Sequence, residues 1–285
     1  MAKVLIAVPH AGVALPEEVS GRVLPHVDAA FLRGQSDMFT DQIFAVPGAD
    51  NHVFSWSRMA VDPNRFEGQT SEGGVVPVVD FDSRPLYPEG QPPTAAECQL
   101  LIERYHRPYH AGLAARIESG SYTFFIDGHS MMAAAPVRSP DFGTPRPDGC
   151  VSNCGDAQGE SIPGGRPLVC SPELTRFVQG RLEHWLMALP APELEGAALP
   201  TGQVGLNTPF LGGHGVRTHA RPDAGMPGLQ LELNQRLWAD EATGQPLPGR
   251  VAWLQSVLER FVADIAEETS LSRPDQDHSA PATLR

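Results

Sequence analysis

The chain has 285 residues, with 34 acidic and 21 basic side chains, and its formal net charge at pH 7 is -13. This charge argues against a nucleic acid or an anionic membrane as a partner, because both attract surfaces rich in lysine and arginine. A small anionic substrate is not excluded, since a few local arginines can outweigh a distant acidic surface. No apolar stretch approaches the ~18 residues of a transmembrane helix, and the start of the chain shows no signal-peptide cleavage site. We therefore expect a cytoplasmic protein.

The four cysteines lack the paired CxxC spacing of a structural zinc site. Cys150 and Cys154 bracket a predicted loop and could meet a metal ion. Reduced thiols of a cytosolic protein are the favoured interpretation.

The first predicted element is a strand over residues 3–8, whose unbroken apolar sequence is typical of a strand covered on both faces. It runs into a Pro-His-Ala-Gly sequence, which places His10 just beyond the strand. Ligands of open α/β sheets bind at the carboxyl ends of the strands, so His10 is a candidate site residue. A histidine after a proline can also be a simple turn residue.

An acidic pair follows, in a helix predicted over residues 36–44. Asp37 and Asp41 are four positions apart and would share one face of that helix. From the residues alone, a solvated helix edge is favoured over a metal ligand and its neighbour.

A strand predicted over residues 51–60 precedes an Asp-Pro-Asn-Arg sequence. In it, Asn64 and Arg65 could bind a carboxylate, because the guanidinium fork matches the two carboxylate oxygens. A surface turn is an equally good interpretation. Arg84 comes later, in a stretch predicted to be a loop that lies over another part of the fold.

The strongest helix signal covers residues 94–118, which begin with a Thr-x-x-Glu capping box. Pro108 should kink this helix. His106 and His110 have the i,i+4 spacing of a helical metal-binding pair. Packing or hydrogen bonding is the favoured role for both, because no glutamate lies between them.

An aromatic and β-branched sequence over residues 122–126 predicts a buried strand. An Asp-Gly-His-Ser sequence follows at the point where the strand should emerge. Asp127 and His129 therefore occupy the same kind of position as His10. Two histidines at strand ends favour one shared site.

Loops alternate with short elements in the next part of the chain. Residues 133–165 are rich in proline, glycine, aspartate and serine, which predicts a long loop of the kind that is either functional or disordered. A strand is predicted over residues 166–170, and an amphipathic helix capped by Ser171 continues to residue 188.

The last predicted strand covers residues 228–234, where apolar and polar residues alternate. It contains Glu232, and because a lone buried carboxylate is costly, a metal ion, an arginine or water must lie close to it. A closing helix over residues 249–267 and a polar tail over residues 270–285 complete the chain. We expect a single α/β domain over residues 1–269.

In this order, the features resemble those of the N-formylglutamate amidohydrolase family, which is in turn similar to the zinc carboxypeptidases. The resemblance covers about residues 4–265. It rests on residues 9–12, Asp37 with Asp41, residues 62–65, residues 84–87, residues 106–110, residues 127–130, Gly212 and Gly213 with Arg217, and Glu232.

This resemblance implies a three-layer fold with a mostly parallel or mixed sheet between helices, as in zinc exopeptidases. It also implies one zinc ion per chain, with His10 and His129 as ligands and Glu232 as the general base. Carboxypeptidases have a glutamate ligand three residues after the first histidine, where this chain has Val13. Asp37 is the expected substitute, with Asp41 as the other choice.

The resemblance implies further that Asn64 and Arg65 hold a substrate carboxylate. Arg84, Arg217 or Arg221 could hold another. Asp127 would orient His129 or a neighbour, and His214 could help to stabilise an oxyanion.

The activity implied is zinc-dependent hydrolysis of N-formyl-L-glutamate to formate and L-glutamate, in histidine degradation. Two alternatives stay open. One is hydrolysis of another N-acyl amino acid or a short peptide-like amide, and the other is a carboxylate-binding protein without catalysis on the same fold.

Overall fold

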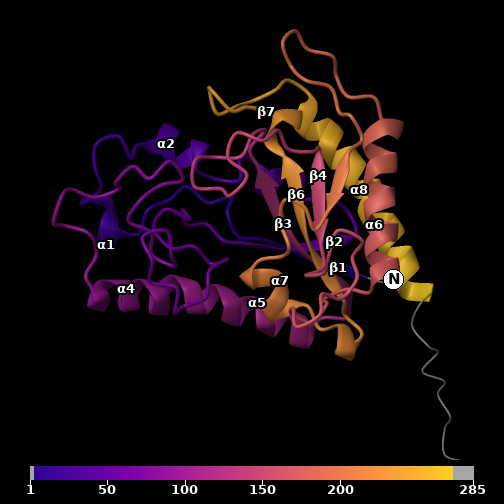
Figure 1. Ribbon diagram of the computed structural model, residues 1–285, viewed down its shortest axis with the longest axis horizontal. Coiled ribbons are helices and arrows are strands. Elements are labelled where there is room, and N and C mark those ends of the chain that lie inside the picture. The colour runs from indigo at the N-terminus through magenta and orange to yellow at the C-terminus, as the bar shows by residue number, and fades with distance from the viewer. Residues whose placement is uncertain (1–2, 272–285) are drawn as a thin grey trace, which may run out of the picture.

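The computed structural model describes residues 3–271, and a six-stranded β-sheet lies at its centre (Figure 1). The strands lie side by side in the order β2-β1-β3-β6-β4-β5. A separate pair, β7 and β8, forms a small hairpin. The bounds are β1 Lys3–Val8, β2 Ala49–Val53, β3 Tyr122–Met131, β4 Gly149–Ser152, β5 Val204–Leu206, β6 Gly228–Asn234, β7 Ala239–Asp240 and β8 Gln245–Pro246.

The direction of the strands makes the sheet mixed. β1, β2, β3 and β6 run parallel to one another, whereas β4 is antiparallel to β6 and has β5 parallel to it. The prediction of an α/β fold with a mostly parallel or mixed sheet between helices is confirmed.

Helices cover both faces of the sheet. Successive residues of a strand point to opposite faces, so each strand contributes side chains to two different cores. Ile6 and Phe124 belong to the larger core, which packs against α6 and α8. Leu5 and Phe125 belong to a smaller core on the opposite face, next to α5 and α7. The bounds are α5 Arg107–Ser119, α6 Pro172–Ala188, α7 His214–His219 and α8 Arg250–Leu271.

The N-terminal third of the chain adds a third packed region beside the sheet, on the side of α1, α2 and α4 in Figure 1. Its apolar core includes Val19, Leu86 and Leu101 and is separate from the two cores of the sheet. This region brings Asp62 and Asn64 to the carboxyl ends of β1 and β3, where they contact His10 and His129. The bounds of its short helices are α1 Glu17–Ser20, α2 Ala29–Gly34 and α4 Ala95–Leu101. The short helix α3, Thr40–Ile43, packs against α8 and belongs to the larger core of the sheet.

The helix predicted over residues 94–118 is present from Ala95 to Ser119, and its capping box is confirmed: Thr94 accepts from Glu97, and Glu97 accepts from Thr94. The helix changes its hydrogen-bond pattern just before Pro108. A π-helical turn at Ile102–His106 separates α4 from α5 and directly precedes Pro108. The wider turn rearranges the backbone hydrogen bonds where proline offers no N–H.

Two predicted strands have different lengths in the structure. β3 continues past Ile126 to Met131, because β6 pairs with it as far as the Met131–Asn234 match. His129 therefore lies within a strand, not after one. The strand predicted over residues 51–60 ends at Val53, opposite the end of its neighbour β1 at Val8.

The helix predicted over residues 36–44 is shorter than expected. It begins only at Thr40, because Phe39 has a left-handed backbone with φ of 62°. Asp37 thus precedes the helix, and Asp41 lies on it and is exposed. The two carboxylates do not share a helical face.

The predicted loop over residues 133–165 contains strand β4, which the polar composition had hidden. The strand predicted over residues 166–170 is absent, since this segment is irregular and contains Pro167. The helix over residues 171–188 is confirmed, with Ser171 accepting from the N–H of Leu174.

The closing helix α8 reaches Leu271, two residues into the predicted tail. The rest of that tail, residues 272–285, lies outside the described residues. Within residues 3–271 no helix combines the length and apolar character needed to cross a membrane. The four cysteines are free thiols, and Cys150 and Cys154 do not belong to any candidate metal-binding group found among the described residues.

Candidate active site

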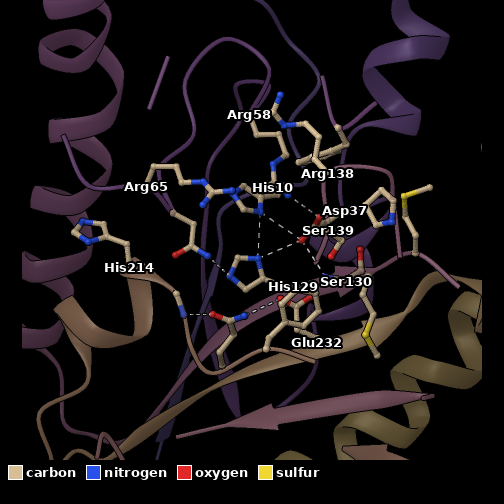
Figure 2. Close-up of a pocket in the computed structure, with 18 of the residues that line it drawn as sticks. His10, Asp37, Arg58, Arg65, His129, Ser130, Arg138, Ser139, His214 and Glu232 are labelled. Carbon is tan, nitrogen blue, oxygen red and sulfur yellow. Dashed lines mark hydrogen bonds and ion pairs between the residues drawn. The ribbon is translucent and has the colours of Figure 1, made fainter. Parts of the chain in front are cut away.

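A cavity of about 620 Å³ opens at the carboxyl ends of β1, β3 and β6 (Figure 2). His129 and Glu232 point into it from adjacent strands, where they are paired in register. Other predicted site residues that line the cavity are His10, Asp37, Asn64, Arg65, Arg217 and His214. The structure therefore brings together residues that are far apart in the chain, at the carboxyl ends of the strands, where ligands of α/β folds bind.

His10, Asp37 and His129 form a compact buried group, joined by dashed lines in Figure 2. The Nδ1 atoms of the two histidines are 3.1 Å apart. Oδ2 of Asp37 lies 3.3 Å from Nδ1 of His129 and 3.6 Å from Nδ1 of His10. Three possible ligand atoms thus face one another.

The spacing and chemistry of these three atoms fit a zinc ion. A tetrahedral ion with ligands at about 2.0–2.1 Å places its ligand atoms about 3.3 Å apart. The observed separations of 3.1, 3.3 and 3.6 Å bracket that value. Two imidazoles and one carboxylate are a common donor set of catalytic zinc sites, in which a fourth position stays open.

Each histidine of the group has a carboxylate beside its other ring nitrogen. Nε2 of His10 lies 2.8 Å from Oδ1 of Asp62. Nε2 of His129 lies 3.3 Å from Oδ1 of Asp127 and 3.2 Å from the amide nitrogen of Asn64. Carboxylates in such positions fix the orientation of metal-binding imidazoles and make them more basic.

Asp37 is fixed by its neighbours as well as by its position. Its Oδ2 accepts the backbone N–H of Ser130, and its own N–H donates to the carbonyl of His10. Burial alone would raise the pKa of Asp37, but hydrogen bonds from His10 and His129 and the charge of Arg58 lower it, and the net pKa is below its usual range. Asp37 is therefore an anionic oxygen donor.

Arg58 lies between two of the buried carboxylates. Its guanidinium donates to Oδ2 of Asp62 at 2.9 Å and lies 3.5 Å from Oδ1 of Asp37. Burial would raise the pKa of Asp62, yet the charges of Arg58 and His10 bring it well below its usual range. Neither Arg58 nor a role for Asp62 was predicted from the sequence. The Asp-Pro-Asn-Arg sequence was the only signal of this contact.

His129 has a strong affinity for protons in this setting. Burial would lower its pKa, but the charge of Asp127 and hydrogen bonds to Asp127 and Asp37 raise it well above the usual value. A metal ion bound to Nδ1 would have to replace the proton on that atom. Metal binding to this site should therefore release protons.

Glu232 lies next to the group and is 6% exposed. One oxygen accepts the side-chain amide of Gln230 at 2.7 Å. Burial raises the pKa of Glu232 to about 8, against the lowering effect of His129. A buried carboxylate with a pKa near neutrality, in a cavity and beside possible metal ligands, is suited to proton transfer.

Gly213, just before α7, and Gly215, on α7, leave room for Asn64 and Asp127 to approach the group. The N–H of Gly215 donates to Oδ1 of Asn64, and the N–H of Val216 donates to Oδ2 of Asp127. A Cβ on Gly213 would lie 2.5 Å from the Asn64 amide, and one on Gly215 would lie 2.5 Å from Oδ2 of Asp127. Any larger residue would push these side chains away.

The arginines that line the cavity agree only in part with those predicted. Arg65 and Arg217 line it, but Arg84 does not. Arg84 donates to Oδ2 of Asp80 at 2.6 Å and lies over the ring of Phe31, and these contacts hold it elsewhere. We correct the prediction for Arg84 accordingly.

The predicted loop over residues 133–165 supplies two cavity arginines that the sequence analysis missed, Arg138 and Arg146. In Figure 2, Arg138 and Arg65 lie on different sides of His10. The only sequence signal for Arg138 and Arg146 was the unusual length of that loop.

A family model described as N-formylglutamate amidohydrolase matches residues 2–239 of the chain. The N-formylglutamate deformylase of Pseudomonas aeruginosa is 30% identical over an alignment of 259 residues, which covers 83% of this chain and 82% of that protein. The N-formylglutamate deformylase of Pseudomonas putida is 28% identical over 256 residues, with the same coverage of both chains.

Two solved structures share the fold. The crystal structure of an N-formylglutamate amidohydrolase from Ralstonia eutropha JMP134 superposes with a TM-score of 0.71 at 25% identity, over 95% of both chains. A gene product of Agrobacterium tumefaciens superposes with a TM-score of 0.56 at 19% identity, over 94% of this chain and 92% of that one. The second likeness concerns the fold alone.

Proposed function

Because the chain belongs to the N-formylglutamate amidohydrolase family, we propose that it hydrolyses the formamide of N-formyl-L-glutamate to formate and L-glutamate. Two relatives carry the name N-formylglutamate deformylase. The observation that carries the proposal is the group of His10, Asp37 and His129 beside Glu232 in an arginine-lined cavity. The reaction would belong to histidine degradation, and we infer a cytoplasmic location for the enzyme.

His10, Asp37 and His129 would hold one zinc ion. A bound zinc ion polarises an amide carbonyl and lowers the pKa of water to about 7. With the ion bound, Asp62 and Asp127 would accept the N–H of the outer nitrogens of the two histidines and leave both Nδ1 atoms as ligands.

Glu232 would act as the general base and then as the general acid. It accepts a proton from the attacking water and delivers the proton to the leaving nitrogen of glutamate. Its pKa of about 8 applies to the site without a cation. Positive charge beside the carboxylate would lower that pKa and favour the ionised form at neutral pH.

The cavity offers cationic groups for both carboxylates of the substrate. Arg65 and Arg217 lie on the side of Asn64 and α7, and Arg138 comes from another loop. Arg65 and Arg138 line the cavity from different sides of His10, so each could pair with one carboxylate of the substrate (Figure 2). His214, also in the cavity, is a candidate for stabilising negative charge on the reacting carbonyl.

A second candidate is hydrolysis of an amide with a larger acyl group. The cavity wall includes Phe66, Phe210 and Leu211, which form apolar surface that a formyl group alone would not cover. N-acetyl-L-glutamate and N-formyl-L-glutamate would distinguish the two candidates when they are compared at equal concentration.

The experiment that tests the proposal is formate release from N-formyl-L-glutamate, before and after chelation and after readdition of zinc. Glu232→Gln serves as the matched variant, because the amide keeps the size of the side chain and removes the base. We expect zinc-restorable turnover in the wild type and bound zinc without turnover in the variant. Zinc bound without any hydrolysis of either substrate would favour a carboxylate-binding protein.

A further inference from the structure

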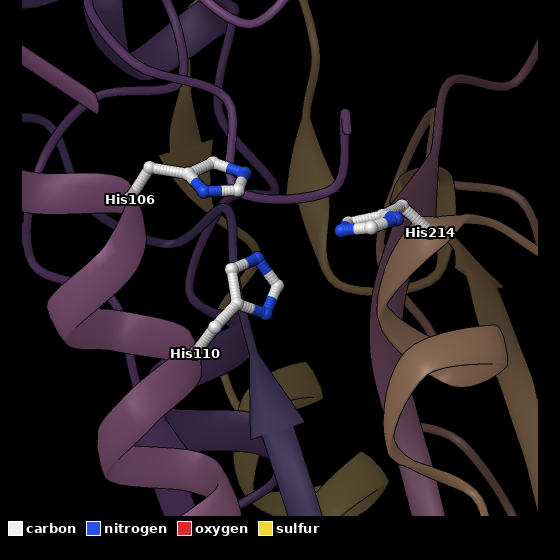
Figure 3. Close-up of side chains that lie close together, drawn as sticks. All are labelled: His106, His110 and His214. Carbon is white, nitrogen blue, oxygen red and sulfur yellow. The ribbon is translucent and has the colours of Figure 1, made fainter. Parts of the chain in front are cut away.

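A second group of histidines joins His214, which lines the cavity, to two helical histidines that contact the backbone of the Asp-Pro-Asn-Arg loop (Figure 3). His106 and His110 are one turn apart on the helix formed by the π-helical turn and α5, and His214 is the first residue of α7. In Figure 3 the three rings point toward a common centre. None of the three belongs to the group of His10, Asp37 and His129.

The separations of these rings suit a shared metal ion. One nitrogen from each ring can be chosen so that all three lie within 4.8 Å of one another. The ring centroids are 4.5 Å apart for His106 and His110, 5.2 Å for His110 and His214, and 6.1 Å for His106 and His214. Three imidazoles bound to one tetrahedral ion at about 2.1 Å would have centroids about 5 Å apart.

The outer nitrogens of the two helical histidines differ in their surroundings. Nδ1 of His110 lies 2.8 Å from Nε2 of the buried His219. Nδ1 of His106 is buried without a hydrogen-bond partner, and the nearest carboxylate oxygen, on Glu67, is 3.9 Å away. If Nε2 of His110 bound a metal ion, its Nδ1 would carry the proton and donate to Nε2 of His219, which would fix the orientation of the ring.

The inner nitrogens bind the backbone of the Asp-Pro-Asn-Arg loop. Nε2 of His106 lies 2.7 Å from the carbonyl oxygen of Arg65, and Nε2 of His110 lies 2.9 Å from that of Pro63. Each donates its N–H to the carbonyl when no metal is bound. A metal ion at Nε2 would break both hydrogen bonds and release the loop that carries Asn64 and Arg65.

We propose that His106, His110 and His214 form a second binding site for a divalent transition-metal ion such as zinc. The ion binds more weakly here than at His10, Asp37 and His129, because it must compete with two hydrogen bonds and has no carboxylate among its three protein ligands. Its binding loosens the loop of residues 62–65 and raises the KM for an anionic substrate. The effect on KM rests on the proposed function, but binding of the ion does not.

The first test measures metal stoichiometry without substrate. The metal-free full-length protein is dialysed to equilibrium against increasing zinc, and bound zinc per chain is measured. We expect two steps and two equivalents in the wild type. His214→Gln keeps both hydrogen bonds to the loop and should lose the second step, as should His110→Gln. His184→Gln, at an exposed position on α6, should retain both steps.

The outcomes separate this proposal from the proposed function. A wild type that saturates at one equivalent would overturn it, and so would a second equivalent that persists in both His214→Gln and His110→Gln. Retention of the first, tight equivalent shows that a variant has folded. Asp37→Asn should lose the tight step and keep the weak one. Two equivalents without formate release would support the second site and contradict the proposed activity.

A kinetic measurement then tests the link to the loop. Raising zinc from one to several equivalents per chain should increase the KM for N-formyl-L-glutamate several-fold, with a smaller change in kcat. In His214→Gln the same additions should leave KM constant, whatever its starting value. An equal rise in KM in this variant would show that the second site does not control the loop.

Discussion

The Nδ1 atoms of His10 and His129 lie 3.1 Å apart, although 119 positions separate the two residues in the chain. β1 and β3 are neighbouring parallel strands, so both histidines reach the same end of the sheet. Their Nε2 atoms face Asp62 and Asp127. Two lone pairs and the carboxylate of Asp37 are thereby directed at one point, where a proton or a metal ion must compensate them.

The carboxylate that completes this group can be identified by comparing two aspartates. Asp37→Asn should lower zinc affinity strongly, because the substitution removes an anionic donor from the buried group. Asp41→Asn should have no effect, because Asp41 is exposed on α3. Competition with a chromogenic chelator measures both affinities. Loss of zinc in Asp41→Asn, with Asp37→Asn unchanged, would reverse the assignment.

The carboxylate of Asp62, which faces the outer nitrogen of His10, should contribute to metal affinity without touching the ion. Asp62→Asn weakens the hydrogen bond to Nε2 of His10 and leaves Arg58 with fewer anionic partners. Substitutions of this kind typically reduce metal affinity about 10–100-fold. The exposed Asp82→Asn is the control. An unchanged zinc affinity in Asp62→Asn would show that this contact only supports the fold.

Local patterns predicted much of this arrangement. The apolar residues of β1 and the alternation in β6 predicted both strands with their correct ends. His10 and His129, which were expected near the carboxyl ends of two strands, lie in contact. The capping box at Thr94 defined the start of a long helix. In these cases the signal is contained in neighbouring residues.

Contacts between distant segments were not predictable in the same way. Arg58 lies in an irregular stretch, and only the folded chain brings it to Asp37 and Asp62. Arg84 had the residue type of a carboxylate-binding arginine and lies in an irregular stretch, but Asp80, four positions away, holds its guanidinium. Strand β4 was hidden because it is short and lies between polar loops.

The arginines of the cavity should differ from Arg84 in their effect on substrate binding. Arg65→Lys and Arg138→Lys remove a planar fork from the cavity, and a charge-assisted hydrogen bond of this kind contributes about 1.5–3 kcal/mol. We expect KM for N-formyl-L-glutamate to rise about tenfold or more in each variant. In Arg84→Lys, KM should remain at the wild-type value. Steady-state kinetics of formate release with saturating zinc would decide, and an increase in KM only for Arg84→Lys would refute this assignment of the cavity.

The buried His219 should make the folded protein sensitive to acid. Burial lowers the pKa of His219 to about 4, and its Nε2 is hydrogen-bonded to His110. In the unfolded chain the pKa of a histidine is about 6.5, so the unfolded state binds more protons below that pH. The free energy of unfolding therefore falls as the pH decreases from about 6.5 toward 4, and this one group accounts for about 2 kcal/mol between pH 7 and pH 5. Urea unfolding of the metal-free protein at the two pH values measures the loss. His219→Gln, which can still donate to His110, should show a loss smaller by up to that amount, and the exposed His184→Gln should behave as the wild type. An equal loss in wild type and His219→Gln would mean that His219 takes up its proton without unfolding.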